Sequence, residues 1–494
     1  MGPLSFSPTR PMTPLDLAVM AVYFAVVIGI GSWFARRQTD ATDYFLGHRS
    51  LPWPAVMLSI VATETSALTV ISVPGLAARG DFTFLQISFG YLVGRIGVAA
   101  WLLPGYFRGN QETAYARLEQ RFGARTRRAA SAVFMVVRAL GDSVRVFATA
   151  IPLSAITGWP VWISVLVVCS VTLVYTWRGG LQAVVWVDVL QWGLYVVAGV
   201  AAVVVAAGLA GGFGRAFDAA AVTGRLRVID LQLSWSVPYT LLGGLVGGAL
   251  LSAASHGTDH LIVQRLLATR ALRDARLALV GSGVLVILQF ALFLLVGAFL
   301  WAAGADPGTG PSDALFPRFM VERLPQGLSG LAIAGVLAAA MSTVSSSLNA
   351  LASATTHDFY APLTGRRDPR HLLVAGRWAT VAWAVILAGG ALSFRSTDTP
   401  VVELALSVAS VTYGGLLGLF VLGGLSSRAR QRDAILALVV ATTAMLVIVL
   451  GKPGPFATLA WPWYVPLGLA ITLATGWVAS RFSPRLAEQS RRDA

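Results

Sequence analysis

Long runs of apolar residues alternate with short polar segments along almost the whole chain of 494 residues. One helix needs roughly 20 apolar residues to cross a bilayer. Stretches near this length recur throughout, and no segment between them is long enough for a soluble domain. They lie at about 15–35, 53–76, 82–105, 129–157, 161–177, 182–208, 236–255, 277–302, 328–356, 378–394, 400–424, 433–451 and 460–480. The pattern therefore predicts an all-α integral membrane protein with about 13 transmembrane helices.

Two of these stretches are interrupted. Residues 61–69 contain one acid and four hydroxyl side chains, and residues 243–249 contain four glycines, which weaken a helix. Interrupted helices at corresponding positions of two halves are typical of transporters built from inverted repeats. Each interrupted stretch begins a set of five, so we expect two inverted halves. The predicted parts of this single polytopic domain (1–494) are an extra helix at 15–35, repeats at 53–208 and 236–424, two helices at 433–480 and a cytoplasmic tail at 481–494.

Composition and charge refine this prediction. The chain is 56% hydrophobic and 12% charged, with a net charge of +14. Most of its 37 basic residues fall in alternate segments between the apolar stretches, as the positive-inside rule requires. This predicts a multi-pass protein of the cell (inner) membrane with its N-terminus outside and its C-terminus cytoplasmic. Charge spread over short loops makes no continuous groove for nucleic acid, and the single cysteine excludes an intrachain disulfide.

A dense group of hydroxyl side chains, residues 342–347, lies inside the apolar stretch 328–356. Polar groups at membrane depth are costly unless they bind something. Ala339, Ser342 and Thr343 share one helical face, where one carbonyl and two hydroxyl oxygens suit a small hard cation such as sodium. The alternative is that these hydroxyls bond back to their own helix or pack against a neighbour.

The interrupted stretch 61–69 offers a second set of oxygens. Carbonyls freed at Ala62 and Thr65 are natural cation ligands, and the helix that follows the break favours an anion at its N-terminal end. Ser66 and Thr69 could hydrogen-bond a solute. Glu64 is an acid near mid-membrane, and the alternative is a structural kink with Glu64 protonated or reaching the membrane surface.

Two further charged features lie inside predicted spans. Asp188 is the only acid between Asp142 and Asp218, and an intramembrane carboxylate is a functional candidate by default. Arg138, Asp142 and Arg145 share one helical face, which leaves one positive charge over. A guanidinium facing a cavity is a good fork for a carboxylate. The alternative for the arginines is an ion-pair network that fixes helix packing.

Several motifs together resemble the sodium:solute symporter family, over roughly residues 15–450. They are RGGLQAVVWVDVLQ at 178–191, GTDHLIVQR at 257–265, LAAAMST at 337–343 with THDFY at 356–360, and YARLEQRFG at 115–123. The resemblance implies a leucine-transporter-like fold of five-plus-five inverted repeats. It also implies sodium ligands at Ala62, Thr65, Ala339, Ser342 and Thr343, an ion route past Asp188, and allows a second ion at Ser345 and Ser346.

For the solute, the resemblance implies contacts from Ser66, Thr69, Phe82 and Gln86, with Glu64 and Arg138 at the same site. Sugar-transporting relatives carry polar amide and acid groups after the break, where this chain has Leu68 and Thr69, so a sugar is disfavoured.

The predicted function is therefore sodium-coupled secondary symport of a small organic solute, with an organic anion such as a carboxylate favoured. Amino-acid-like solutes, sugars and inorganic anions remain open. The expected partners are the solute, sodium and the lipid bilayer, with no cofactor besides Na+ as coupling ion. Proton coupling through Glu64 or Asp188 and a non-transporting membrane sensor are the alternatives. We expect no enzyme, because no nucleophile and base set is visible, and His256, Asp259 and His260 do not complete a metal site.

Overall fold

The computed structural model describes residues 13–36, 38–109, 111–305, 315–394 and 401–482. All the secondary-structure elements named in this part of the chain are helices. Residues 483–494 of the predicted tail lie outside it. Eight described helices are long and apolar enough to cross a membrane, or nine if one bent pair counts as a span. The helices of the first half are α1 (Pro14–Ala35), α2 (Ala41–Leu46), α3 (Trp53–Glu64), α4 (Ala67–Arg79), α5 (Leu85–Gly97), α6 (Leu103–Tyr106), α7 (Ala116–Phe122), α8 (Ala124–Thr157), α9 (Val161–Leu209) and α10 (Phe213–Val222).

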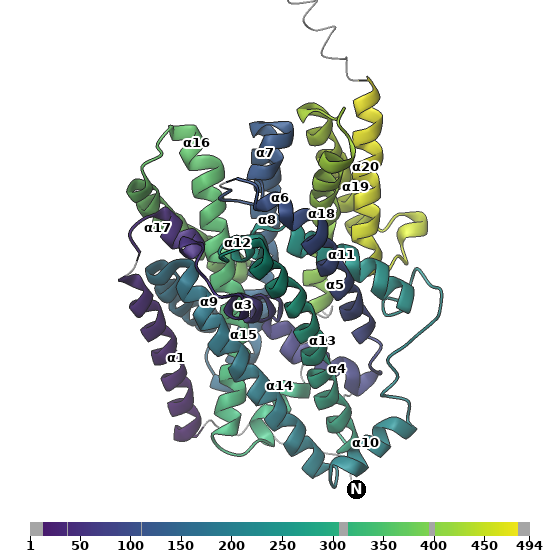
Figure 1. Ribbon diagram of the computed structural model, residues 1–494. Coiled ribbons are helices and arrows are strands. Elements are labelled where there is room, and N and C mark those ends of the chain that lie inside the picture. Colours follow the sequence, from purple (N-terminus) through teal and green to yellow (C-terminus); the bar gives the residue numbers. More distant parts are fainter. Residues whose placement is uncertain (1–12, 37, 110, 306–314, 395–400, 483–494) are drawn as a thin grey trace, which may run out of the picture.

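The second half begins with a π-helical turn, η3 (Gly243–Gly247), that runs directly into α11. Its helices are α11 (Gly248–Gly257), α12 (His260–Leu267), α13 (Leu272–Ala302), α14 (Leu315–Glu322), α15 (Leu328–Ala354), α16 (Ala361–Thr364), α17 (Pro369–Ser393), α18 (Val401–Leu425), α19 (Gln431–Gly451) and α20 (Tyr464–Phe482). Figure 1 shows α3, α12 and α15 at the centre of the bundle, with α1 and α17 on one side and α18 to α20 on the other.

The break predicted at 61–69 is present. Helix α3 ends at Glu64, Thr65 and Ser66 are extended, and the two helical segments are bent by 62°. The end of a helix leaves its last carbonyls without the usual donors. The polar residues at the break therefore lie at the centre of the bundle beside carbonyls that accept from outside the regular helical pattern, such as that of Glu64, which accepts from the N–H of Ser66.

The second break does not lie where the glycines predicted it. The backbone stays helical through the glycine run, and the helix ends at Gly257, before Asp259 caps α12. The glycines instead allow α11 and α5 to touch. A Cβ built on Gly90 would lie 2.1 Å from the carbonyl oxygen of Gly244. Close helix contact, not helix breaking, is their physical role.

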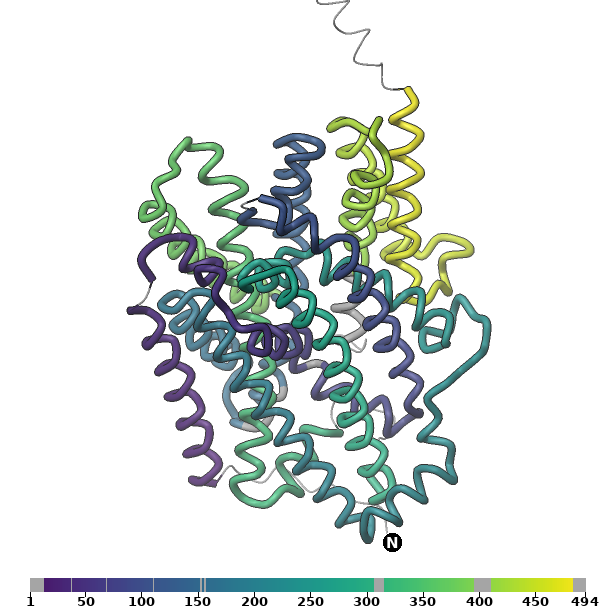
Figure 2. Tube along the Cα trace, viewed as in Figure 1, coloured from purple at the N-terminus to yellow at the C-terminus, as the bar shows by residue number. Residues whose placement is uncertain are grey.

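Two apolar stretches predicted at 161–177 and 182–208 form the two halves of α9. Gly180 separates them with φ of +57°, a conformation that glycine adopts without strain. The tube in Figure 2 follows this bend and the long connection from α10 to η3. Helix α15 packs against α9 and α3, so the hydroxyl side chains at 342–347 of α15 lie against both helices.

Candidate functional site

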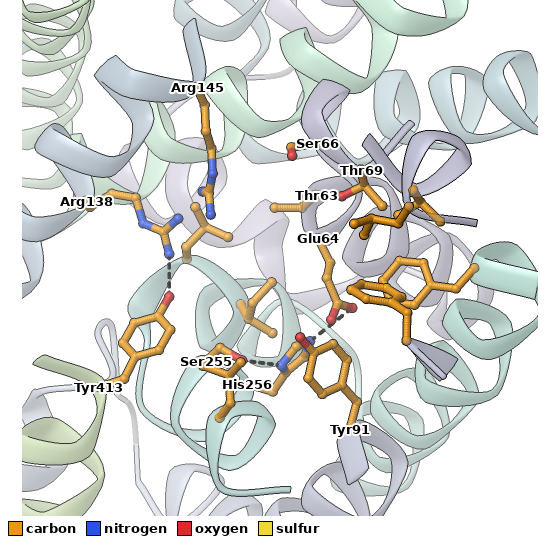
Figure 3. Close-up of a pocket in the computed structure, with 17 residues that line it drawn as sticks. Thr63, Glu64, Ser66, Thr69, Tyr91, Arg138, Arg145, Ser255, His256 and Tyr413 are labelled. Atoms are coloured by element: carbon orange, nitrogen blue, oxygen red, sulfur yellow. Dashed lines mark hydrogen bonds and ion pairs between the residues drawn. The ribbon is translucent and has the colours of Figure 1, made fainter. Parts of the chain in front are cut away.

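A cavity of about 120 Å³ lies at the break in the first interrupted span. Its walls come from α3, α4, α5, α8, α11, α12, α13 and α18 (Figure 3). Apolar residues complete a lining whose polar members are Thr63, Glu64, Ser66, Thr69, Tyr91, Arg138, Arg145, Ser255, His256 and Tyr413. Predicted solute residues Glu64, Ser66, Thr69 and Arg138 are thus brought together.

Arg138 and Arg145 reach the cavity from α8. Arg138 donates to the carboxylate of Asp259 and, at 3.2 Å, to the hydroxyl of Tyr413. Arg145 donates to Asp142 at 2.8 Å. The surplus positive charge predicted for the arginines of α8 is therefore wrong, because Asp259, far along the chain, supplies the second carboxylate. Asp259 is held there by its role as the N-cap of α12, where it accepts from the backbone N–H of Leu261 at 2.9 Å.

These ion pairs are not symmetric with respect to the cavity. The side chains of Arg138 and Arg145 are 10% and 20% exposed, whereas those of Asp142 and Asp259 are 1% exposed. Both carboxylates line a smaller neighbouring pocket and not the main cavity. A solute in the cavity therefore meets guanidinium groups, with their counter-charges behind them.

Glu64 faces the same cavity from the end of α3. Its Oε2 atom pairs with Arg95 of α5, which is fully buried and also donates to Ser282 at 2.7 Å. The same oxygen lies 3.7 Å from Nε2 of His256. The arginine partner keeps a charged Glu64 compatible with burial.

Phe82 and Gln86 do not line the cavity. Gln86 is fully buried in the first turn of α5, where its amide donates to the carbonyl of Tyr239 at 2.9 Å and accepts from the N–H of Asp230 at 3.0 Å. It thus anchors the connection that leads to η3. Phe84 and Tyr91 take the places expected for these two residues in the cavity wall.

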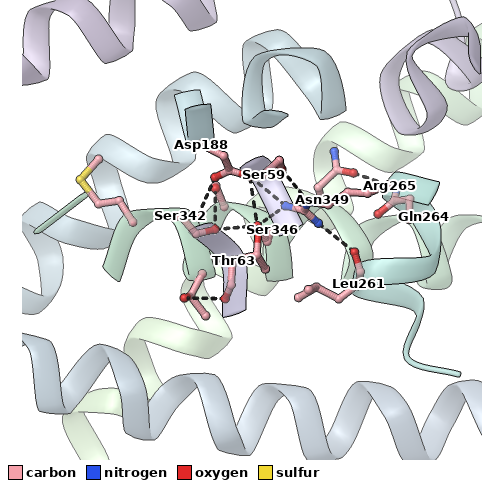
Figure 4. Close-up of polar contacts among 12 residues, drawn as sticks. Ser59, Thr63, Asp188, Leu261, Gln264, Arg265, Ser342, Ser346 and Asn349 are labelled. Atoms are coloured by element: carbon pink, nitrogen blue, oxygen red, sulfur yellow. Dashed lines mark hydrogen bonds and ion pairs between the residues drawn. The ribbon is translucent and has the colours of Figure 1, made fainter. Parts of the chain in front are cut away.

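The hydroxyl side chains at 342–347 of α15 lie against the end of α3, as Figure 4 shows. The hydroxyl of Thr343 donates to the carbonyls of Thr63 and Ala339, at 3.3 Å each. Ala62, Thr65, Ala339, Ser342 and Thr343 are all buried, with exposures of 2% or less. The predicted sodium residues thus come from the two elements that the sequence indicated, and these elements touch.

Asp188 lies directly beside this group. Ser342 donates to its Oδ1 at 2.6 Å and Ser59 of α3 donates to its Oδ2. Arg265 approaches Asp188 at 3.2 Å, donates to Ser59 at 2.8 Å and donates to Ser346 (Figure 4). Arg265, which the charge pattern placed in a loop, is fully buried and links α3, α9, α12 and α15.

The two residues predicted for a second ion bond to their own helix. Ser345 and Ser346 both donate to the carbonyl of Ser342, at 3.0 and 2.6 Å. Ser346 also lies 3.0 Å from the hydroxyl of Thr63. The guanidinium of Arg265 therefore takes part of the space that a second ion would share, and the second ion stays a prediction.

Sequence reasoning did not assign four residues to the site that the structure places there: Arg265, His256, Tyr91 and Tyr413. Tyr91 and Tyr413 carry no motif, and their place depends on which helices meet. One signal in the sequence could have identified Arg265. Asp188 lies inside a predicted span, and a buried carboxylate needs a buried positive partner.

Comparisons with known proteins agree on a class of membrane transporter. The fold superposes on a solved structure described as the substrate-bound outward-open state of a Na+-coupled sialic acid symporter with a novel Na+-site, with a TM-score of 0.86, 25% identity and coverage of 96% of this chain and 99% of that chain. A nucleobase–cation symporter shares the fold at a TM-score of 0.54 and 13% identity, over 92% of this chain and 99% of that chain.

The chain belongs to the sodium:solute symporter family, whose model matches residues 44–441. Human sodium-coupled monocarboxylate transporter 2 is 29% identical over 90% of this chain and 74% of its own length. A sodium/sialic acid symporter of Aliivibrio fischeri is 27% identical over 87% of each chain. The human sodium/iodide cotransporter is 31% identical over 83% of this chain and 65% of its own length. Members of this family are multi-pass membrane transporters, not enzymes.

Proposed function

We propose that this protein is a sodium-coupled secondary symporter that imports a small organic anion by alternating access. The observation that carries the anion is the unequal exposure of the charges around the cavity. Two guanidinium groups face it, while their carboxylate partners are 1% exposed and lie behind. Relatives described as transporters of monocarboxylates and sialic acid support the same solute class.

Sodium would bind where α3 and α15 meet. Its ligands are the carbonyls of Ala62, Thr65 and Ala339 and the hydroxyls of Ser342 and Thr343. Oxygen ligands of this kind suit a hard cation. Because the ligands come from both elements, the ion would hold the broken span against α15 and favour the conformation that binds solute. Asp188 would receive the ion on its way to the cytoplasm.

Charge balance links the two sites. Four carboxylates and four guanidinium groups lie around the cavity and the hydroxyl side chains of α15, so their charges balance. The contacts join Glu64 to Arg95, Asp142 to Arg145, Asp259 to Arg138 and Asp188 to Arg265, and Arg138 also lies 3.6 Å from Asp142. A lone sodium would add an uncompensated charge to a buried region, which is costly. One sodium together with one monoanion adds none, so each favours the binding of the other.

We also propose how the spans are arranged and how the chain is oriented in the membrane. The 13 predicted spans would form five-plus-five inverted repeats, 53–208 and 236–424, flanked by the extra helix at 15–35 and the pair at 433–480. The N-terminus would lie outside and the C-terminus in the cytoplasm.

Uptake by purified protein in proteoliposomes tests the function. Short-chain carboxylates should accumulate under an inward sodium gradient and not under a matched potassium gradient. Accumulation driven by a pH gradient without sodium would establish proton coupling instead. Sodium-dependent binding without any uptake would indicate a sensor.

A conservative substitution tests the carboxylate fork. Arg138→Lys keeps the charge but loses the two-pronged geometry. We expect KM for the carboxylate to rise about tenfold, the equivalent of about 1.4 kcal/mol. Arg178→Lys, at an exposed position on α9, is the matched control and should leave KM unchanged. An unaltered KM in Arg138→Lys would remove Arg138 from the solute site.

A further inference from the structure

The cavity has two polar walls with different chemistry. Figure 3 shows Arg138, Arg145 and Tyr413 on one side, and Glu64, His256 and Tyr91 on the other. The first wall presents positive charge, for the reason given above. On the second wall, Arg95 is fully buried behind Glu64, whose own side chain is 16% exposed. A solute there meets acceptor oxygens and an imidazole.

Each wall also holds a buried nitrogen without a hydrogen-bond partner among the described residues. On the first wall it is Nε of Arg145. On the second it is Nε2 of His256, which lies 3.7 Å from Oε2 of Glu64, beyond hydrogen-bond distance. His256 is 2% exposed, and its other ring nitrogen lies 2.8 Å from the hydroxyl of Ser255. A buried polar atom left without a partner is destabilising. A solute with a polar group at each end would give both nitrogens a partner.

Glu64 has acceptor capacity to spare. Its contacts with Arg95 and His256 both involve Oε2. The second oxygen, Oε1, makes no hydrogen bond within the described part of the chain, and the residue lines the cavity. A carboxylate has about four acceptor positions. The second wall can therefore receive a donor from the solute.

We propose that Glu64 and His256 form a second subsite that recognises a neutral hydrogen-bond donor, so that the transported anion is a hydroxy carboxylate. The inference rests on the proposed anion site at Arg138 and Arg145. Charge decides between a hydroxyl and an ammonium group. Glu64 already has Arg95 as its counter-charge, and an ammonium group brought in with sodium would leave a surplus positive charge in a buried site.

Binding of matched acids tests the proposal. The probes are butanoate, its 2-, 3- and 4-hydroxy derivatives, and zwitterionic 4-aminobutanoate, each titrated with and without sodium and followed by thermal unfolding of the full chain. At least one hydroxybutanoate should bind about tenfold more tightly than butanoate, which corresponds to one additional hydrogen bond. The position of its hydroxyl reports the distance between the walls. The zwitterion should gain no advantage.

Two variants assign the preference to the second wall. In His256→Phe, which keeps the ring, the ratio of affinities for the preferred hydroxybutanoate and butanoate should fall to about one. His371→Phe, in the first turn of α17, should keep the ratio. If His256→Phe fails to fold, the double variant Glu64→Gln with Arg95→Gln removes both charges of the pair together and should lower the same ratio.

The outcomes separate the two proposals. If all the acids bind equally in the presence of sodium, the second subsite is wrong and the anion site stands. If the zwitterion binds most tightly, the neutral donor is wrong. If no acid binds with sodium, the proposed function itself fails.

Discussion

At the residue scale, two fully buried arginines in the described part of the chain pair with carboxylates on other helices. Glu64 on α3 pairs with Arg95 on α5, and Asp188 on α9 pairs with Arg265 on α12. Removing one member would leave an uncompensated charge out of contact with water. Pairing therefore explains why ionised groups persist at membrane depth, and unequal exposure within the pairs decides which charge a solute meets.

The hydroxyl of Thr343 gives the most direct residue-scale prediction. Thr343→Val keeps the shape of the side chain and removes one proposed sodium ligand. We expect the sodium concentration for half-maximal uptake to rise about tenfold, since one lost ligand contributes about 1.5 kcal/mol. A sodium titration of uptake measures this.

Thr472→Val on α20 is the matched control. Its hydroxyl is equally buried and donates to the carbonyl of Gly468 at 2.7 Å, away from the proposed site. Its sodium dependence should not change. A similar shift in both variants would mean that the effect of Thr343 is structural.

The pair of Asp188 and Arg265 gives a prediction about stability. Asp188→Asn and Arg265→Gln should each lower the free energy of unfolding by about 3–5 kcal/mol, because each leaves the other charge buried alone. The double variant should lose less than the sum of the two. The surface pair Asp81 and Arg227, whose arginine is 58% exposed, should show coupling of only about 0–1 kcal/mol in the same double-mutant cycle. Additive losses at Asp188 and Arg265 would contradict a coupled pair.

At the element scale, helix ends and helix contacts position the site. The end of α3 exposes backbone oxygens to α15, and the cap of α12 holds Asp259 where Arg138 can reach it. Glycines set the distance between α5 and α11, which carry Tyr91 and His256 into the cavity wall. The cavity therefore depends on how closely these two helices approach.

Two glycines of α5 test this dependence. Gly90→Ala places a Cβ against the backbone of α11 and should cost about 1–3 kcal/mol by forcing the helices apart. Gly97→Ala adds a Cβ with no atom within 4 Å and should stabilise α5 by up to about 1 kcal/mol. Thermal unfolding of the two variants should therefore shift in opposite directions. A melting temperature for Gly90→Ala at or above that of the unchanged protein would contradict the close contact.

At the scale of the whole molecule, the question is how much charge crosses the membrane in one cycle. Every acid around the two sites has its own arginine, and the guanidinium of Arg265 contacts Ser346, where a second ion would bind. We therefore expect one sodium to accompany one monoanion. Such a cycle moves no net charge.

Uptake should then be insensitive to membrane potential. In proteoliposomes, a potassium diffusion potential of about 100 mV, negative inside, should leave solute accumulation unchanged at a fixed sodium gradient. Movement of one net positive charge would instead raise the accumulation ratio by roughly 50-fold, from about 2.3 kcal/mol per charge. An increase of that size would indicate a second sodium and return Ser345 and Ser346 to the ion pathway.

The sequence by itself determined the class of the molecule, because membrane physics acts on local composition. Runs of about 20 apolar residues predict spans, and the polar interruption at 61–69 predicted the break that the structure has. Hydroxyl side chains in the middle of α15 indicated an ion site for the same reason. These features depend on neighbours in the chain, so they could be read without knowing the fold.

Only the tertiary structure decided the partners of the charged groups and the true role of the glycines. Asp259 and Arg138 are 121 residues apart, and Asp188 and Arg265 are 77 apart. No local pattern joins such residues. The glycines at 243–249 were predicted to break a helix, but the backbone there stays helical and packs closely against α5. Charge pairing and close packing are energies between elements, so they are fixed only when the helices meet.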